Sequence, residues 1–325
     1  MKQETFDHLT RHLSATRSRR GALSLFVAGA MAPLLSRAAS GAQTGKRGEG
    51  RAKAPRGNQC DVCDNGCRYD KLQPAIDAAK AGDTITVCEG TYKSNPTIYI
   101  NKPLTVVGAG ADDTEMKGGG FVRVLMIGPS GVVTLRGLTI TGGKEDKIPR
   151  LGGAGILLLD KGKLTLEDCV VEKNDSAEGG GIVVSPGSEL HLVRSSVNDN
   201  SAFSVGGGII VKAGGRATLD AGSSVSDNKS KVWGGGIYVA GGTLVLESGS
   251  LIEKNKARLV GGGIYAGSGS SVTLASGSRV TANDAGDMGG GIFGFKSTIT
   301  LADTAIVAKN DPNNCAGMEI ANCIG

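Results

Sequence analysis

A four-residue motif, Gly-Gly-Gly-Ile, recurs through the second half of the chain and constrains its fold more than any other feature. Successive copies are separated by 27, 28, 27 and 28 residues and begin at Gly179, Gly206, Gly234, Gly261 and Gly289. A looser copy, Gly-Ala-Gly-Ile, begins at Gly153. Self-similarity at a fixed period of this size indicates a stack of repeated structural units.

Two further columns of residues recur in step with the glycine motif. One column has the form Val/Ile-x-x-Asn, and its asparagines are Asn174, Asn200, Asn228, Asn255, Asn283 and Asn310. The other is a short alternating segment such as Leu164-Thr165-Leu166. Alternation with period 2, between clusters of Gly, Ser, Asn and Asp, is typical of short strands and not of helices.

About three short strands in each repeat cannot bury an apolar face alone, so each coil has to stack on the next. We therefore predict an all-β fold, a single-stranded parallel β-helix, in which equivalent residues lie about 4.8 Å apart. The isoleucines should form an inward ladder of Ile156, Ile182, Ile209, Ile237, Ile264 and Ile292. The asparagines should form a second ladder of bonded amides at a tight corner, where they would take the left-handed backbone.

One segment before the repeats has helical periodicity. Leu72, Ala75, Ile76 and Ala79 share a face, and Gly82 follows. We predict a capping helix over the open end of the first coil. Less regular early strands are expected at residues 84–87, 97–100, 104–107, 122–127, 132–135 and 138–140.

The N-terminal region is predicted to be an export signal followed by a linker. In residues 1–42, Arg19-Arg20 precedes a short apolar run and small residues, which resembles a twin-arginine (Tat) signal; a basic Sec signal is the alternative. Residues 43–59 have the composition of a basic disordered linker. Residues 60–325 then form the folded domain, and export predicts a secreted or cell-surface location without an integral membrane segment in the mature chain.

The net charge is unevenly distributed. Residues 1–42 carry six basic and two acidic side chains, and residues 43–59 carry five and one, so each segment contributes +4. The whole chain is +5, so residues 60–325 carry 5 − 8 = −3. A mildly acidic body argues against a nucleic-acid-binding face.

Seven cysteines fit a disulfide-bonded exported protein better than a zinc site, since no histidine lies near the N-terminal group. We expect disulfides within the N-terminal group and between the last two cysteines, that is, among Cys60, Cys63, Cys67 and Cys88, and between Cys315 and Cys323. Cys169 is left over and is interpreted as a small core residue.

Two stretches carry a resemblance to known families. Leu72–Tyr92 resembles the entry segment of secreted bacterial right-handed β-helix proteins with a pectate-lyase-like fold. The repeats resemble those of polymorphic outer-membrane proteins of the adhesin type, although Val or Ile stands where that family usually has Phe. The resemblance covers residues 60–325 and implies right-handed coils. It implies adhesion weakly, and it does not carry over that family's membrane barrel.

The catalytic motifs of lyases, galacturonases and methylesterases with this fold have no counterpart that we find. The densest acidic cluster is Asp112, Asp113 and Glu115, in a glycine-rich segment expected to be a loop. Such carboxylates suit calcium binding or acid–base hydrolysis, while a solvated turn is the alternative. His191 is expected at the surface. We expect no metal and no cofactor.

An apolar stripe follows the isoleucine ladder. It contains Leu157, Val183, Ile210, Tyr238, Tyr265 and Phe293, and alternation predicts that it points outward. Trp233 stands in a matched column before the glycines. We hypothesise that Trp233, Tyr238, Tyr265 and Phe293 form a ligand face for sugar rings or a protein partner. The alternative is a stacked ladder that the chain itself covers.

The sequence thus favours an exported, non-catalytic, adhesin-like protein that binds an extracellular polysaccharide or surface protein. The rival interpretation is a polysaccharide lyase or hydrolase, because this fold hosts both kinds of protein. Ice binding would require regular threonine rows. The threonine column is interrupted by His191 and Val245, which argues against it.

Overall fold

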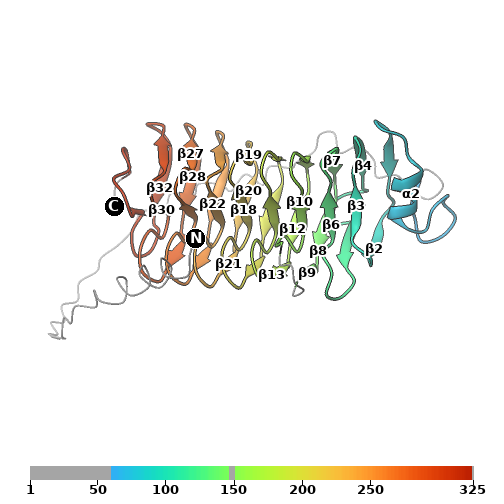
Figure 1. The fold of residues 1–325 in the computed structure, drawn as a ribbon, viewed down its shortest axis with the longest axis horizontal. Helices are drawn as coiled ribbons and strands as arrows, with labels where there is room; N and C mark the ends of the chain where they lie inside the picture. The colour runs from blue at the N-terminus through green and yellow to red at the C-terminus, as the bar shows by residue number, and fades with distance from the viewer. Residues whose placement is uncertain (1–59, 146–150, 324–325) are drawn as a thin grey trace, which may run out of the picture. The chain divides into compact units, whose positions relative to one another are not determined.

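The computed structural model describes residues 60–145 and 151–323, which form a parallel β-helix whose coils follow one another along one axis (Figure 1). In each regular coil the chain passes through four parallel sheets, which we number I to IV in chain order. The predicted leader, residues 1–42, and the predicted linker, residues 43–59, lie outside the described residues.

Sheets I and II each contain nine strands. Sheet I consists of β1 (Thr84–Thr86), β4 (Leu104–Val107), β7 (Val132–Arg136), β11 (Lys163–Glu167), β15 (Glu189–Val193), β19 (Arg216–Leu219), β23 (Thr243–Leu246), β27 (Ser271–Leu274) and β31 (Thr298–Leu301). Sheet II consists of β2 (Gly90–Ser94), β5 (Thr114–Gly118), β8 (Thr139–Thr141), β12 (Val170–Glu172), β16 (Ser196–Asn198), β20 (Ser224–Ser226), β24 (Leu251–Glu253), β28 (Arg279–Thr281) and β32 (Ile306–Ala308).

Sheet III is shorter and sheet IV completes the coil. Sheet III consists of the two-residue strands β9 (Lys144–Glu145), β13 (Asp175–Ser176), β17 (Ser201–Ala202), β21 (Lys229–Ser230), β25 (Lys256–Ala257) and β29 (Asp284–Ala285). Sheet IV consists of β3 (Ile98–Ile100), β6 (Leu125–Ile127), β10 (Ile156–Leu158), β14 (Ile182–Val184), β18 (Ile209–Lys212), β22 (Ile237–Ala240), β26 (Ile264–Ala266), β30 (Ile292–Gly294) and β33 (Cys315–Ala316).

The inward faces of sheets I, II and IV form one continuous apolar core. The isoleucines of sheet IV are in register, so that Ile156 pairs with Ile182 and Ile182 pairs with Ile209. All six predicted members of this ladder have no exposed surface. Stacking therefore provides each short strand with the apolar neighbours that one coil could not supply.

Over β10, β14 and β18 the outward face of sheet IV is also covered, which corrects the expectation of a solvent-facing stripe for this part of the sheet. Leu157, Val183 and Ile210 are at most 2% exposed and form a second apolar cluster with Val205. The cover is the glycine turn itself. A Cβ atom placed on Gly179, which has a φ of +57°, would lie 2.4 Å from Cγ2 of Val183. Glycine is needed at this position both for the positive φ and for the close approach.

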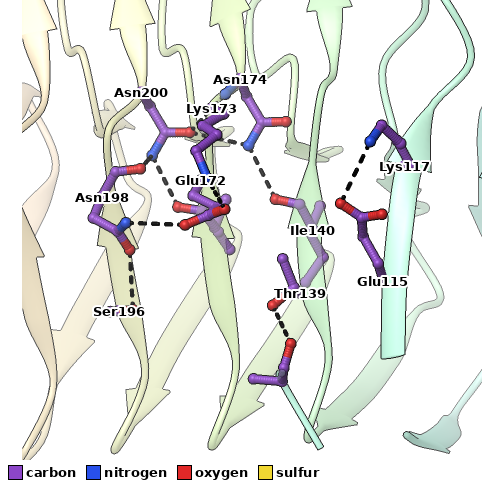
Figure 2. Close-up of polar contacts among 12 residues, drawn as sticks. Glu115, Lys117, Thr139, Ile140, Glu172, Lys173, Asn174, Ser196, Asn198 and Asn200 are labelled. Atoms are coloured by element: carbon purple, nitrogen blue, oxygen red, sulfur yellow. Dashed lines mark hydrogen bonds and ion pairs between the residues drawn. The ribbon is translucent and has the colours of Figure 1, made fainter. Parts of the chain in front are cut away.

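The asparagine ladder occupies the corner between sheets II and III (Figure 2). Asn174 donates from its backbone N and from Nδ2 to Oδ1 of Asn200, at 3.1 and 3.0 Å, and also from Nδ2 to the Ile140 carbonyl at 3.2 Å. The same pattern continues from coil to coil as far as Asn310. These side chains are at most 9% exposed, so each amide satisfies backbone groups that water cannot reach.

The left-handed backbone at this corner belongs to the residue before each asparagine, which corrects our assignment of it to Asn. Lys173 has a φ of 52° and Asp199 a φ of 54°, and the preceding residue is left-handed in the later coils too. A positive φ at this residue bends the chain from sheet II into sheet III. The following Asn keeps ordinary backbone geometry and turns its amide inward, where the ladder forms.

The N-terminal end of the stack is closed by helix α2 (Leu72–Ala78) and by disulfides. Leu72, Ala75 and Ile76 of α2 are buried in the main core. Disulfides join Cys60 to Cys88 and Cys63 to Cys67, and a third disulfide, at the C-terminal end, joins Cys315 to Cys323. Cys169 is free and buried, and burial raises the pKa of its thiol to about 12, so it carries no thiolate near neutral pH.

Several early elements differ from the sequence expectation. Strands β2 and β5 were not predicted, and Glu115 lies on β5 and not in a loop. Sheet III adds a fourth short side to each regular coil. Strands β13, β17, β21 and β25 each hold a buried small residue such as Ala202 beside an exposed polar one, a two-residue pattern that is too short to recognise as a strand.

Candidate functional site

The four aromatic residues of the predicted ligand face stack on one another. Tyr265 lies in the middle, with ring centroids 5.0 Å from Tyr238, 5.2 Å from Trp233 and 5.4 Å from Phe293. The rings of these pairs are within 21° of parallel. The registers that align the backbone, Tyr238 with Tyr265 and Tyr265 with Phe293, place successive rings one coil apart. This is the arrangement of the stacked-ladder alternative.

Both ends of this aromatic stack are closed. Tyr238 follows Ile210 in the register of sheet IV, and a Cβ atom on Gly317 would lie 2.9 Å from ring atoms of Phe293. Burial raises the pKa of the Tyr265 phenol, and the neighbouring Tyr238 adds to the effect. Since the ring faces contact one another, a ligand would meet ring edges instead of the open faces on which a sugar stacks.

The residues of the predicted acidic cluster lie on a turn and on the strand that follows it. Asp112 and Asp113 are exposed on the turn at residues 111–113. Glu115 accepts a hydrogen bond from the Thr91 hydroxyl at 3.0 Å and lies 3.7 Å from Nζ of Lys117 (Figure 2). Within residues 60–145 and 151–323, no group of three or more His, Cys, Asp and Glu side chains has the geometry to hold a metal ion.

Other charged side chains on the outer sheets form pairs between or within coils. Nζ of Lys173 lies 2.6 Å from Oε1 of Glu172, and Nδ2 of Asn198 donates to Oε2 of Glu172 at 3.3 Å (Figure 2). Nε2 of His191 lies 2.8 Å from Oδ2 of Asp220 on the exposed face of sheet I. The carboxylates of Glu172 and Asp220 are thus paired with neighbouring side chains on the outer surfaces of sheets I and II.

A groove that sequence reasoning missed lies along sheet III, whose strands follow one side of the stack (Figure 1). It has a volume of about 480 Å³, and its lining residues are Phe121, Lys144, Glu145, Asp175, Ser176, Ala177, Ser201, Phe203 and Lys231. Phe121 and Phe203 are 62% and 63% exposed, the highest values among the large apolar side chains of the described ranges. Nζ of Lys231 lies 4.6 Å from the centroid of the Phe203 ring.

A buried ion pair builds one wall of this groove. The side chains of Arg123 and Glu145 are 10% and 11% exposed, and the Arg123 Nη2 atom lies 2.6 Å from Oε1 of Glu145. Arg123 also donates to the carbonyls of Gly152 and Gly153 at 2.7 and 2.8 Å, and the Gly152 amide donates to Glu145 at 2.7 Å. Burial lowers the pKa of Arg123, and the charge of Glu145 opposes this shift. The carboxylate of Glu145 is thus held by neighbouring groups.

The sequence did contain a signal for this groove. Phe203 occupies a column in which the equivalent residues of other coils are Ala177, Lys231, Arg258 and Gly286, as the repeated hydrogen bonds across sheet III show. A large apolar residue at an otherwise small or charged exposed position departs from the repeat without improving the core. Such departures point to function more directly than the repeated columns do.

The protein is therefore a right-handed parallel β-helix with a surface groove along sheet III. The family model described as "Right handed beta helix region" matches residues 123–306, more than half of the chain. The chain belongs to this family.

Two curated relatives match a part of the chain. SHC SH2 domain-binding protein 1 of Mus musculus is 28% identical over 145 residues, which are 42% of this chain and 20% of that protein. The Homo sapiens protein of the same name is 29% identical over 146 residues, which are 38% and 20% of the two chains. The chain therefore spans about a fifth of the length of these relatives.

Two solved structures are similar at low identity. An alginate lyase from Paenibacillus sp. str. FPU-7 has a TM-score of 0.36 and 15% identity and covers 72% of this chain and 95% of its own. The pectin methylesterase from Aspergillus niger has a TM-score of 0.39 and 14% identity, covering 85% and 94%. At these values nothing about activity transfers. In the described part of the chain, no helix has the length and apolar character of a membrane span.

Proposed function

We propose that this chain is an exported, non-catalytic binding protein, adhesin-like in its use of a β-helix as a rigid scaffold. The observation that carries the proposal is the makeup of the sheet III groove. Its two exposed phenylalanines provide apolar contact area, whereas its most buried carboxylate, Glu145, is held by Arg123. Acid–base hydrolysis of a glycosidic bond typically uses two carboxylates that face the substrate across a set distance, and Asp175 is the other carboxylate among the described residues that line the groove.

The two curated relatives also support a binding role. Their name describes proteins that bind an SH2 domain, and the matched segment amounts to 42% of this chain. A binding role also suits the fold, because stacked coils hold surface side chains at fixed spacings. The edges of the aromatic stack formed by Trp233, Tyr238, Tyr265 and Phe293 remain a second proposed contact surface.

The rival proposal, a polysaccharide lyase or hydrolase, is separated from ours by product formation. The full-length chain would be applied to a glycan array and incubated with polygalacturonate and alginate, with assays for new reducing ends and for unsaturated products. We expect no product. Product that disappears in Asp112→Asn, Asp113→Asn or Asp175→Asn variants would overturn the non-catalytic proposal.

Export is proposed from residues 1–42 together with the three disulfides, which are typical of oxidising compartments. If the paired arginines belong to a Tat signal, an Arg19→Lys, Arg20→Lys variant will accumulate inside the cell, while wild type reaches the outside. Fractionation followed by immunoblotting measures this. Equal export of both chains would favour the basic Sec signal.

A further inference from the structure

We propose that the sheet III groove binds an extended, acidic peptide segment of a partner protein, with apolar side chains of that segment anchored on Phe121 and Phe203. This inference rests on the proposed function and names the ligand of its binding site. It is drawn from the spacing of the coils that carry the two phenylalanines, the charges around them and the contact between Phe203 and Lys231.

The axial separation of the coils that carry the two phenylalanines matches the repeat of an extended peptide chain. Phe121 precedes β6 and Phe203 precedes β18, and these strands are three pairings apart in sheet IV, through β10 and β14. Three coils correspond to about 14 Å along the axis. An extended peptide rises about 3.3 Å per residue, so side chains at positions i and i+4 point to one face and lie about 13 Å apart.

The charges around the groove favour acidic residues between the two anchors. Lys144 and Lys231 line the groove with Asp175, and Arg123 already offsets the charge of Glu145, so the described lining residues carry a remaining charge of 2 − 1 = +1. Lys229 of β21 pairs in register with Ser201 of the groove and adds a further positive charge beside it. Complementary charge of this kind guides a partner into register and raises its association rate.

The surroundings of the rings favour peptide side chains over stacked sugar rings. The ammonium group of Lys231 already lies over the Phe203 ring, so that a pyranose would have to displace it to stack on that face. An apolar peptide side chain can pack against the rest of the ring while an acidic neighbour pairs with Lys231. Leu151, which is 42% exposed and whose amide donates to Glu145, extends the apolar rim. Aromatic side chains, phenylalanine among them, are enriched in protein–protein interfaces relative to the rest of the surface.

The test begins with selection of a phage-displayed library of random linear peptides on the immobilised full-length chain. We expect enrichment of peptides that carry apolar residues four positions apart with Asp or Glu between them. A fluorescein-labelled synthetic peptide of the enriched sequence is then titrated by fluorescence anisotropy. We expect Phe121→Ser and Phe203→Ser each to weaken its binding by about tenfold or more. Lys231→Glu should weaken binding and reduce its dependence on salt.

Phe295→Ser is the matched control, because Phe295 also has a lysine ammonium, that of Lys296, near its ring, at 5.5 Å, but lies outside the groove. Its affinity should equal that of wild type, and thermal unfolding should show that the groove variants are folded. Absence of enrichment, or equal binding by the Phe121→Ser, Phe203→Ser double variant, overturns the proposal.

A parallel titration with fluorescent oligogalacturonate separates the possible ligands. Glycan binding that Phe203→Ser abolishes would assign the groove to an acidic glycan and overturn the peptide proposal, while leaving a non-catalytic binding role intact. Cleavage of the glycan by wild type would instead overturn the proposed function itself. The two failures are therefore distinguishable.

Discussion

Two sets of aromatic side chains on the outer side of this β-helix have opposite environments. Tyr265 is 8% exposed in the aromatic stack, while Phe203 is 63% exposed beside sheet III. Tyr238, Tyr265 and Phe293 of the stack occupy equivalent positions of successive coils, so parallel register brings them together and each ring covers the next. Phe121 and Phe203 have no aromatic partner one coil away in the described residues. A recurring aromatic column is therefore explained by stability, and an isolated exposed ring is the better candidate for binding.

The largest effect on the free energy of unfolding is expected at the Arg123–Glu145 ion pair, which forms one wall of the groove. Arg123→Ala should lower the free energy of unfolding by about 3–5 kcal/mol, because it leaves the buried Glu145 carboxylate without its cation. Urea titration followed by circular dichroism measures the loss. The double variant Arg123→Met, Glu145→Leu removes both charges and should lose less. A single-variant loss below about 1 kcal/mol would contradict this account of the wall.

Truncating one ring from each set tests whether the two sets differ in their contribution to stability. Tyr265→Ala should cost about 3 kcal/mol, because it opens a cavity between Tyr238 and Phe293 in a closed stack. Phe203→Ala should change the free energy of unfolding by less than about 0.5 kcal/mol, since its ring is mostly in water. Similar losses for both variants would show that exposure does not separate the two sets.

The pH dependence of stability sharpens the account of the stack. Burial raises the pKa of the Tyr265 phenol above its ordinary value of 10.0, so the folded state favours the neutral form. This contribution is fully present below pH 10 and is lost as the pH rises through the folded-state pKa, by at most about 1.4 kcal/mol per pH unit. Unfolding titrations between neutral and strongly alkaline pH should show the decline.

Tyr265→Phe is the control for the pH effect. It keeps the ring in the stack and removes the ionisable hydroxyl, so the alkaline loss of stability should become smaller. Its stability at neutral pH should stay within about 0.5 kcal/mol of wild type. An unchanged alkaline decline would assign it to other groups, of which Tyr238, whose pKa is also raised by burial, is the first to examine.

The smallest effect on stability, and the largest on binding, is expected for the groove rings. The Phe121→Ser, Phe203→Ser double variant should unfold within about 0.5 kcal/mol of wild type while it loses peptide binding. Thermal unfolding and anisotropy, measured on the same preparations, check both halves of the prediction. A double variant that is destabilised as strongly as Tyr265→Ala would show that these rings also belong to the structure.

Much of the fold could be predicted because repetition makes short-range patterns reliable. One coil of three or four short strands is ambiguous, but the same isoleucine and asparagine recurring in phase indicate one stacked arrangement. The capping helix was also recognisable, because Leu72, Ala75 and Ile76 share a helical face that is buried against the core. The early strands β2 and β5 were missed because each contains one large apolar residue, Tyr92 or Met116, among polar and glycine residues, so no apolar alternation marks it.

The candidate site was less predictable because it depends on which turns pack over the outward side chains of the sheets. Alternation correctly placed Val183 and Tyr265 on the outer side of sheet IV, yet it could not show that the glycine turns fold back over that side. Nor could it show that Phe121 and Phe203, 82 positions apart in the chain, line one groove. Contacts between such distant segments follow from the pitch of the coils and the path of each turn.

The parallel β-helix, its inward isoleucine ladder and its asparagine corner can all be predicted from the amino-acid order, because each depends on local periodicity repeated at a fixed interval. The tertiary structure alone decided which outward residues are covered, which residue of the corner takes the left-handed backbone, and where the groove lies. The physical reason is that burial of an outward side chain depends on the packing of turns from its own and neighbouring coils. The amino-acid sequence of one repeat does not specify that packing.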